Sequence, residues 1–191
     1  MTLLGRLLKN RRSGDADTAW NLPNLQGPER LELASRDFGD GGAMALEHCA
    51  KHIRGADRSP HLTWSELPPG TAQLLLVVED VDVPTSKPAV HCVALIDPAA
   101  AAHLEPGALA ARQPAPGVRA LRATVGRGYH GPAPIKGHGP HRYVFQLFAL
   151  SAPVESGPDG TPLDRARPRA LLPAVTATVL GRARLTGVYE R

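Results

Sequence analysis

Two continuous apolar runs in the first half of the chain predict β-strands that are buried on both faces. The first, Gln73 to Glu79, begins after a Pro-Pro-Gly turn and is stopped by Pro84. The second, "AVHCVALIDP", ends at Asp97 and Pro98. Short apolar runs that lack polar alternation and are bounded by turn residues are typical of central strands in a sheet.

A third strand is predicted in the stretch "HRYVFQLFAL", residues 141–150. Successive side chains of a strand point to opposite faces, so alternate positions share one face of the sheet. The residues predicted to share that face are His141, Tyr143, Phe145 and Leu147.

The rest of the chain has weaker patterns. Residues 1 to about 30 predict a short helix and a connector, and residues 30–44 predict a strand that enters a Gly-rich turn. The Ala-, Pro- and Gly-rich residues 99–128 predict helix fragments and a long surface loop. Near the end, apolar spacing predicts a helix that begins at Pro168 and ends before Gly181, and "RARLTGVYE" predicts a closing strand.

These elements predict a mainly β protein with peripheral helices and a C-terminal helix. Strands dominate, and no strand–helix alternation supports a parallel doubly wound sheet. The 191 residues are enough for one buried core, so we expect a single domain. Aromatic residues make up only 4% of the chain, so Leu, Val, Ala and Ile must fill most of that core.

Composition excludes several classes of protein. The net charge is +4, but the basic residues are mostly scattered, so nucleic-acid binding is only weakly signalled and we do not expect it. The chain lacks the roughly 18 consecutive apolar residues of a transmembrane helix, and its first apolar run is too short for a signal peptide. We therefore expect a cytoplasmic protein. Cys49 and Cys92 lie far apart in sequence and are predicted to be buried, reduced thiols.

The first twelve residues have the pattern of a basic amphipathic helix. Four leucines fall on one helical face, with basic side chains around them. The leucines are Leu3, Leu4, Leu7 and Leu8, and the basic residues are Arg6, Lys9, Arg11 and Arg12. We expect this helix to pack on its own domain or on a second subunit.

Gly126, Gly128 and Gly131 match the spacing of a dinucleotide-binding motif but not its context. In that motif the last glycine opens a helix whose N-terminus holds the pyrophosphate. Here Pro132 and Pro134 follow at once and the chain enters a strand. The sequence therefore does not predict a nucleotide cofactor, and no other cofactor is implied.

His48 and His52 have the i, i+4 spacing that can place two imidazoles on one helical face for zinc. Cys49 stands where a zincin requires Glu, and no third ligand can be named. Two satisfied or solvated histidines are therefore favoured over a metal site.

Asp80 and Asp82 form the more informative pair. They lie two residues apart where the first strand ends, so their carboxylates are expected on one side and need stabilising partners. His91 and His141, on the two other firm strands, are candidate partners. Two interpretations stay open, a hydrogen-bonded cluster that pins strand ends together and a ligand site.

The loop before the third strand favours the ligand site. Residues 126–140 are rich in glycine and proline, so backbone N–H groups can approach a ligand and the prolines hold the loop in shape. With imidazole N–H groups from His91 and His141 beside it, the loop predicts a small anion pocket, in which the aspartates orient the imidazoles.

Several of these stretches resemble the phosphatidylethanolamine-binding protein (PEBP) family, also called the Raf-kinase-inhibitor-like family. The residues that carry the resemblance are "LVVEDVDVP", "VHCVALI" and "GPAPIKGHGPHRYVFQLFAL", with "SPHLTWSELPPGT" before them and the bacterial-type "ARLTGVYER" at the end. The resemblance covers roughly residues 30–191. It divides the chain into a basic amphipathic segment with a connector, residues 1–29, and a PEBP-like domain, residues 30–191.

The resemblance implies a single domain of antiparallel sheets with an anion pocket near one end. The family's pocket residues carry over onto Asp80, Asp82, His91, His141 and Tyr143, with Gly131 as loop backbone at the pocket floor. Members bind small anions such as phosphate or a phospholipid head group, and some act on protein partners, including kinases or proteases. No catalysis defines the family, and bacterial relatives imply a homodimer.

Two departures from the family pattern concern the pocket. Many relatives have Asp-Pro-Asp where this chain has Val81 between the aspartates, and an aromatic residue where it has Val90. The carboxylates survive, but the aromatic wall is lost, so the family's ligand size preference is not transferred. The C-terminal residues that gate the pocket in animal members have no match, so Raf-like kinase inhibition is not transferred.

Three functions compete. The leading hypothesis is a non-catalytic protein that binds a phosphate or phospholipid head group and modulates protein partners as a kinase- or protease-inhibitor-like regulator. The alternative is an Asp/His hydrolase that works with or without a bound metal, although Ser59 and Thr63 belong to no recognisable nucleophile motif. The third is an interaction module with a vestigial pocket.

Overall fold

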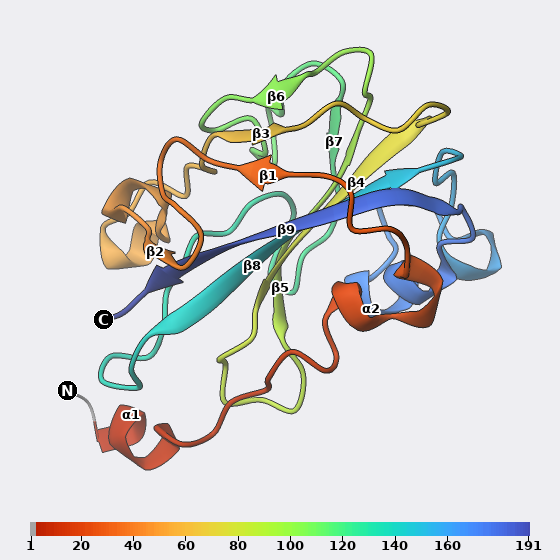
Figure 1. The fold of residues 1–191 in the computed structure, drawn as a ribbon. Helices are drawn as coiled ribbons and strands as arrows, with labels where there is room; N and C mark the ends of the chain where they lie inside the picture. Colours follow the sequence, from red (N-terminus) through yellow and green to blue (C-terminus); the bar gives the residue numbers. More distant parts are fainter. Residues whose placement is uncertain (1–2) are drawn as a thin grey trace.

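The computed structural model describes residues 3–191. Its centre is a six-stranded sheet with the order β2-β9-β8-β4-β5-β7, in which every pairing is antiparallel except the short parallel β2-β9 pair. The strands are β2 (Gly42–Ala43), β4 (Gln73–Asp80), β5 (Ala89–Ile96), β7 (Val118–Ala120), β8 (His141–Leu150) and β9 (Val179–Tyr189). Figure 1 shows the long strands β4, β8 and β9 running side by side across the molecule.

A second, smaller sheet covers one face of the first. It has the antiparallel order β1-β3-β6, with strands of two or three residues. They are β1 (Leu33–Ala34), β3 (Leu62–Trp64) and β6 (His103–Leu104). The predicted antiparallel, mainly β, single-domain fold is confirmed.

The large sheet is buried on both faces, as predicted for its central strand. Leu74 and Leu76 of β4 enter the core shared with the small sheet, whereas Leu75 and Val77 enter a second core on the opposite face. Each such buried side chain contributes about 1.5–3 kcal/mol. The predicted face of β8 is likewise confirmed, because Tyr143, Phe145 and Leu147 all enter the first core.

Helical structure is short and peripheral. The α-helices are α1 (Leu3–Leu8) and α2 (Pro168–Leu171). Single 3₁₀ turns are η1 (Ala19–Asn21), η2 (Pro23–Leu25), η3 (Leu46–His48), η4 (Lys51–Ile53), η5 (Pro158–Gly160) and η6 (Leu172–Ala174). None of the helices in residues 3–191 is long and apolar enough to cross a membrane.

Three details of the sequence prediction are wrong. The C-terminal helix is shorter than expected because Pro173 cannot continue it, and β9 begins at Val179, so Gly181 lies inside a strand. Residues 99–128 contain the strands β6 and β7 rather than helix fragments. Leu7 does not lie on a buried helical face, since it is 73% exposed; the side chains of Leu3 and Leu4 lie outside the described residues.

The turns η1 and η2 fasten the chain to the second core. The N–H of Ala19 donates to Oε2 of Glu79 at 2.7 Å, and the N–H of Trp20 donates to Oε1 of Gln146 at 2.6 Å. The Trp20 ring packs on Phe148. The guanidinium of Arg182 stacks over the Trp20 ring, with its Cζ 3.9 Å from the ring centroid. This attachment directs residues 3–14 across the end of the large sheet where β4 stops and β8 starts.

The two cysteines are free and buried in the fold, as predicted. Burial raises the pKa of the Cys49 thiol to about 11 and that of the Cys92 thiol to about 12. Both are therefore thiols rather than thiolates at neutral pH.

Candidate functional site

The antiparallel pairing brings the predicted acidic and imidazole side chains to one edge of the large sheet. Asp80, the last residue of β4, stands opposite Tyr143 of β8 and opposite Ala89 of β5. His141 and His91 each lie two residues from those partners. The end of β4 and the starts of β5 and β8 therefore meet at the same edge.

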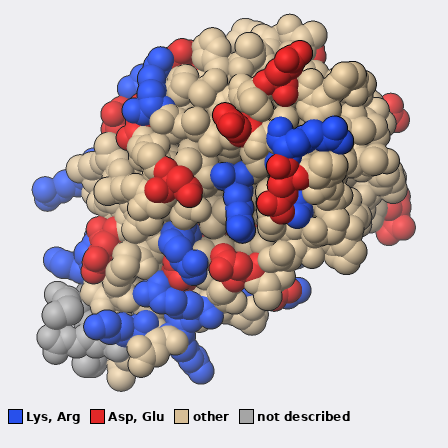
Figure 2. Space-filling view, in the orientation of Figure 1, with Lys and Arg blue, Asp and Glu red and all other residues tan. Residues whose placement is uncertain are grey.

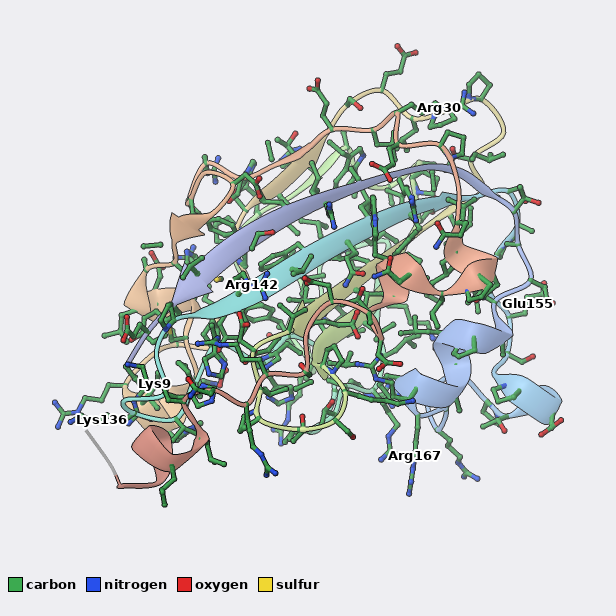
Figure 3. All side chains as sticks on the ribbon, turned by 60° about the horizontal axis from the view of Figure 1, so that its bottom comes forward. Lys9, Arg30, Lys136, Arg142, Glu155 and Arg167 are labelled. Carbon is green, nitrogen blue, oxygen red and sulfur yellow. The ribbon has the colours of Figure 1, made fainter. Side chains whose placement is uncertain are left out.

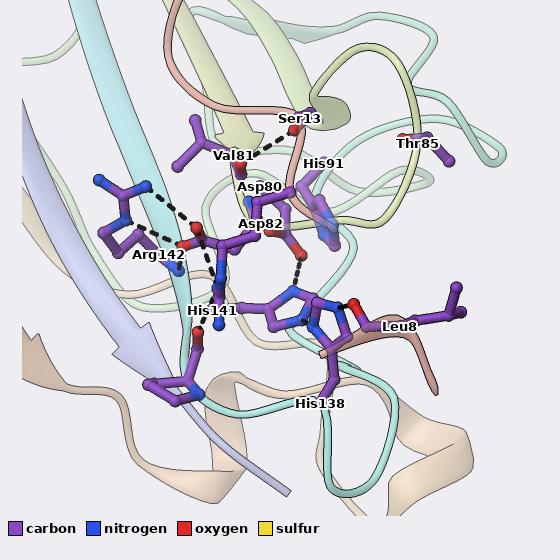
Figure 4. A network of polar contacts seen from close by, with 12 residues as sticks. Leu8, Ser13, Asp80, Val81, Asp82, Thr85, His91, His138, His141 and Arg142 are labelled. Carbon is purple, nitrogen blue, oxygen red and sulfur yellow. Dashed lines mark hydrogen bonds and ion pairs between the residues drawn. The ribbon is translucent and has the colours of Figure 1, made fainter. Parts of the chain in front are cut away.

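A row of hydrogen bonds runs from Asp80 outwards (Figure 4). Nδ1 of His141 lies 2.8 Å from Oδ2 of Asp80, and Nε2 of His141 lies 2.7 Å from Nδ1 of His138. Nε2 of His138 then faces two backbone carbonyl oxygens, Leu8 at 2.8 Å and Arg11 at 3.1 Å. We call Asp80, His141 and His138 the Asp–His–His row.

The hydrogen bonds of the row fix the number of its protons, and this number decides whether its outer end is a donor or an acceptor. Carbonyl oxygens only accept, so Nε2 of His138 carries a proton, and the other two contacts, His138–His141 and His141–Asp80, need one each. The row therefore holds three protons. An ionised Asp80 and two neutral imidazoles would together hold two protons and carry one negative charge. The row is therefore electrically neutral as a unit and presents an N–H donor at its outer end.

Asp82 takes a different set of partners. The backbone N–H and Nε of Arg142 donate to its Oδ2 at 2.8 and 2.9 Å, and Nη2 of Arg142 donates to Oδ1 at 3.0 Å. Nη1 of Arg12 lies 3.0 Å from the same Oδ1. Burial alone would raise the pKa of Asp82, but the hydrogen bonds from Arg142 and Arg12 outweigh it and hold the pKa below its ordinary value.

His91 lies beside the row without joining it. Its Nδ1 is 2.7 Å from the carbonyl oxygen of His130, and its ring meets Tyr143 edge to face at 5.2 Å. Burial lowers the pKa of His91, with the charge of Asp80 opposing the shift, so the ring is neutral at neutral pH. Its single proton then sits on Nδ1, and Nε2 is an acceptor.

The Tyr143 hydroxyl is an unsatisfied polar group at the site. It is buried and has no hydrogen-bond partner within residues 3–191, as is also true of Nε2 of His130. Burial, and then the nearby charge of Asp80, raise its pKa well above the ordinary value, so it stays protonated. A buried polar group without a partner is costly, and a bound ligand or water would satisfy it.

Gly131 has a structural position. Its N–H donates to Oδ1 of Asp57 at 2.8 Å, so it is not directed at the Asp–His–His row. A Cβ here would come within 2.3 Å of the carbonyl oxygen of His48, which explains why glycine is needed. The role of Gly131 at a pocket floor stays a prediction.

The structure separates the pair that resembled a zinc motif. His48 ends η3 and His52 lies in η4, so they do not share one helical face. Nδ1 of His48 is 2.9 Å from the carbonyl oxygen of Arg58. Among residues 3–191, no group of three or more His, Cys, Asp or Glu side chains is arranged to hold a metal ion.

Residues 3–14 cover the site. Asp80, Asp82, His138, His141 and Tyr143 are all at most 2% exposed. The N–H groups of Ser13 and Gly14 donate to the carbonyl oxygens of Val83 and Val81 at 2.9 and 2.8 Å, and Nη1 of Arg12 donates to the carbonyl oxygen of Pro140 at 2.9 Å.

Comparison with known proteins decides the family. The model of the phosphatidylethanolamine-binding protein family matches residues 34–190, most of the chain. The chain belongs to the PEBP family. Its relatives place it with the bacterial-type members.

Three relatives illustrate the relationship within the PEBP family. A UPF0098 protein of Aquifex aeolicus is 33% identical, with 84% of this chain and 89% of that protein covered. A putative lipoprotein, LppC, of Mycobacterium tuberculosis is 34% identical, with 85% and 73% covered. The crystal structure of the PEBP-family protein YbcL of Escherichia coli has a TM-score of 0.70 at 28% identity, with 84% and 98% covered.

Sequence reasoning missed three residues of this PEBP-type site: His138, Arg142 and Arg12. His138 is the outer donor of the row, a part that we had expected His91 and His141 to play directly. The i, i+3 spacing of two histidines in "HGPHR" was an available signal for it. Arg12 precedes the matched residues 34–190, so the family pattern says nothing about it.

Proposed function

We propose that this chain binds a small phosphate-bearing anion, either inorganic phosphate or a phospholipid head group, at the outer end of the Asp–His–His row. The observation that carries the proposal is the N–H of His138, held as a donor by a row that is neutral overall. Such an N–H donates a hydrogen bond to an anionic oxygen without the repulsion that bare carboxylates would cause.

The surroundings of the row also favour an anion. The carboxylate of Asp82 pairs with Arg142 at 2.9 Å, so its charge is neutralised within the site. Nε2 of neutral His91 is an acceptor and the Tyr143 hydroxyl is a donor, and both lie at the inner, Asp80 end of the row rather than at its outer end. Figure 2 shows basic side chains gathered at the end of the molecule where α1 lies, which favours the approach of an anion.

Binding without catalysis fits the geometry better than hydrolysis. Members of the family are generally non-catalytic binding proteins. Nε2 of His141, the position that would activate a nucleophile, contacts His138 instead. The Ser59 hydroxyl oxygen accepts from the N–H groups of Gly107 and Leu109, so Ser59 serves the loop there. We infer that the bound state modulates protein partners such as a kinase or protease.

The test is a phosphate titration followed through the histidine side-chain NMR signals. We expect saturable shifts of the His138 and His141 signals in the wild type, and their loss in His141→Ala, because that change breaks the row in its middle. His52→Ala, at an exposed histidine outside the site, is the matched control and should titrate like the wild type. Unchanged binding by His141→Ala would rule out the Asp–His–His row as the anion site.

A further inference from the structure

Residues 3–14 occupy the place that the proposed anion would take. The carbonyl oxygens of Leu8 and Arg11 accept from the same His138 N–H that we assign to the ligand. A phosphate oxygen and these carbonyls cannot use that donor at full strength together, because all are acceptors competing for one proton. Figure 4 shows the Leu8 backbone lying against His138.

Close backbone packing also seats this segment. A Cβ on Gly5 would come within 2.4 Å of the carbonyl oxygen of Lys136 and 3.0 Å of the carbonyl carbon of Gly137. Only glycine therefore lets α1 approach the loop that carries His138. In Figure 3, Lys9 and Lys136 both lie at this end of the molecule, near α1 and the 136–138 loop.

Two described features of the segment are exposed to solvent, unlike the attachments of the turns that follow it. A six-residue helix is too short to be stable alone, and Leu7 contributes little burial at 73% exposure. The Arg12 side chain is 33% exposed in its pair with Asp82, so that pair is partly screened by water. By contrast, Ala19 and Trp20 are fixed by buried hydrogen bonds. The chain can therefore open before residue 18 without disturbing the core.

We propose that residues 3–14 form an intramolecular lid that inhibits anion binding by occupying the outer end of the Asp–His–His row. This regulation rests on the proposed anion site. The apparent dissociation constant of the ligand equals its intrinsic value divided by the fraction of molecules with the lid open. Any change that loosens the lid but spares the row therefore tightens binding.

Two substitutions in the full chain loosen the lid at different points. Gly5→Ala drives the α1 backbone away from Lys136 and Gly137, and Arg12→Gln removes the contacts of the guanidinium with Asp82 and Pro140. Each has a matched control. Gly39→Ala adds the same methyl group where no described atom lies within 4 Å of it, and Lys9→Gln removes the same charge from an exposed position of the same segment.

The readout is the phosphate dissociation constant from histidine NMR, together with hydrogen exchange of the Ser13 and Gly14 amides. We expect Gly5→Ala and Arg12→Gln to bind phosphate about tenfold more tightly, which a change of about 1.4 kcal/mol in lid closure produces, and to exchange faster. The two controls should match the wild type.

The outcomes separate the two proposals. Equal, measurable phosphate affinity in the wild type and both lid variants would overturn the lid and leave the anion site standing. Faster amide exchange in the lid variants without phosphate binding in any protein would overturn the anion site, and with it the competition. Should Gly5→Ala fail to fold, Arg12→Gln against Lys9→Gln decides by the same comparison.

Discussion

At the scale of single residues, Asp82 connects three parts of the site through its hydrogen bonds. Its two oxygens receive three hydrogen bonds from Arg142 and contact Arg12, so one carboxylate links β8 to the lid. The backbone N–H of Asp82 donates to Oδ1 of Asp80 at 2.9 Å, so it holds the carboxylate of the Asp–His–His row by the oxygen that does not contact His141. Each of these bonds is charge-assisted and therefore stronger than a neutral one.

Asp82→Asn should destabilise the fold by about 2 kcal/mol, because charge-assisted bonds become neutral ones. The folded-state pKa of Asp82 lies below its ordinary value of 3.8, so its stabilisation is present above that value and is lost as the pH falls through the lowered pKa. Urea unfolding of wild type and variant across acidic pH checks this. A difference in unfolding free energy that stays constant below pH 3.8 would contradict it.

Tyr143→Phe tests the unsatisfied hydroxyl. Removing a buried donor that has no partner should leave the unfolding free energy unchanged or raise it by about 1 kcal/mol, while weakening phosphate binding if the ligand uses the group. Chemical denaturation and the NMR titration measure the two effects separately. A loss of stability above about 1 kcal/mol would mean that the hydroxyl is hydrogen-bonded to Asp80 in the protein.

At the scale of elements, the long strands were predictable because each contains an apolar run that is longer than is usual in a surface loop. The run of β4 and the alternation of β8 each contain enough residues to show a pattern. Of the small sheet, only β1 lies within a predicted strand, in residues 30–44; β3 and β6 could not be found this way, because strands of two or three residues have no period. The helix ending at Leu171 was overestimated because apolar spacing continued past Pro173.

The candidate site was predictable only in part for a related reason. Strand ends located Asp80, Asp82, His91 and His141, since antiparallel pairing follows from the strands themselves. His138 lies in a loop and acts through His141, and Arg12 reaches the site from a segment distant in sequence. Contacts of that kind depend on tertiary packing, which no local pattern encodes.

At the scale of the whole molecule, the amino-terminal region consists of two parts with different attachments. Residues 18–25 enter the second core through Ala19, Trp20 and Leu25, although they precede residues 34–190 that match the family. The lid, residues 3–14, lies over the site, and its described side chains from Leu7 to Ser13 are not among the buried residues of either core. Local stability is therefore expected to change sharply between them.

Trp20→Ala should lower the unfolding free energy by about 3–5 kcal/mol, because it removes a buried aromatic ring and its contacts with Phe148 and Arg182. Lys9→Gln should change it by less than about 1 kcal/mol, and Arg12→Gln by no more than the roughly 1.4 kcal/mol assigned to lid closure. Thermal and chemical unfolding measure both. A comparable loss in Arg12→Gln would show that the lid belongs to the cooperative core.

The short stretch between Gly14 and Thr18 has a consequence for competition. Because Thr18 and the residues after it stay in place, an opened lid remains within a few residues' reach of His138, as though present at an effective concentration in the millimolar range. A free ligand must compete with this tethered segment, whatever the amount of protein. Closure by a second subunit would weaken on dilution, whereas closure by the molecule's own chain is the same at every protein concentration.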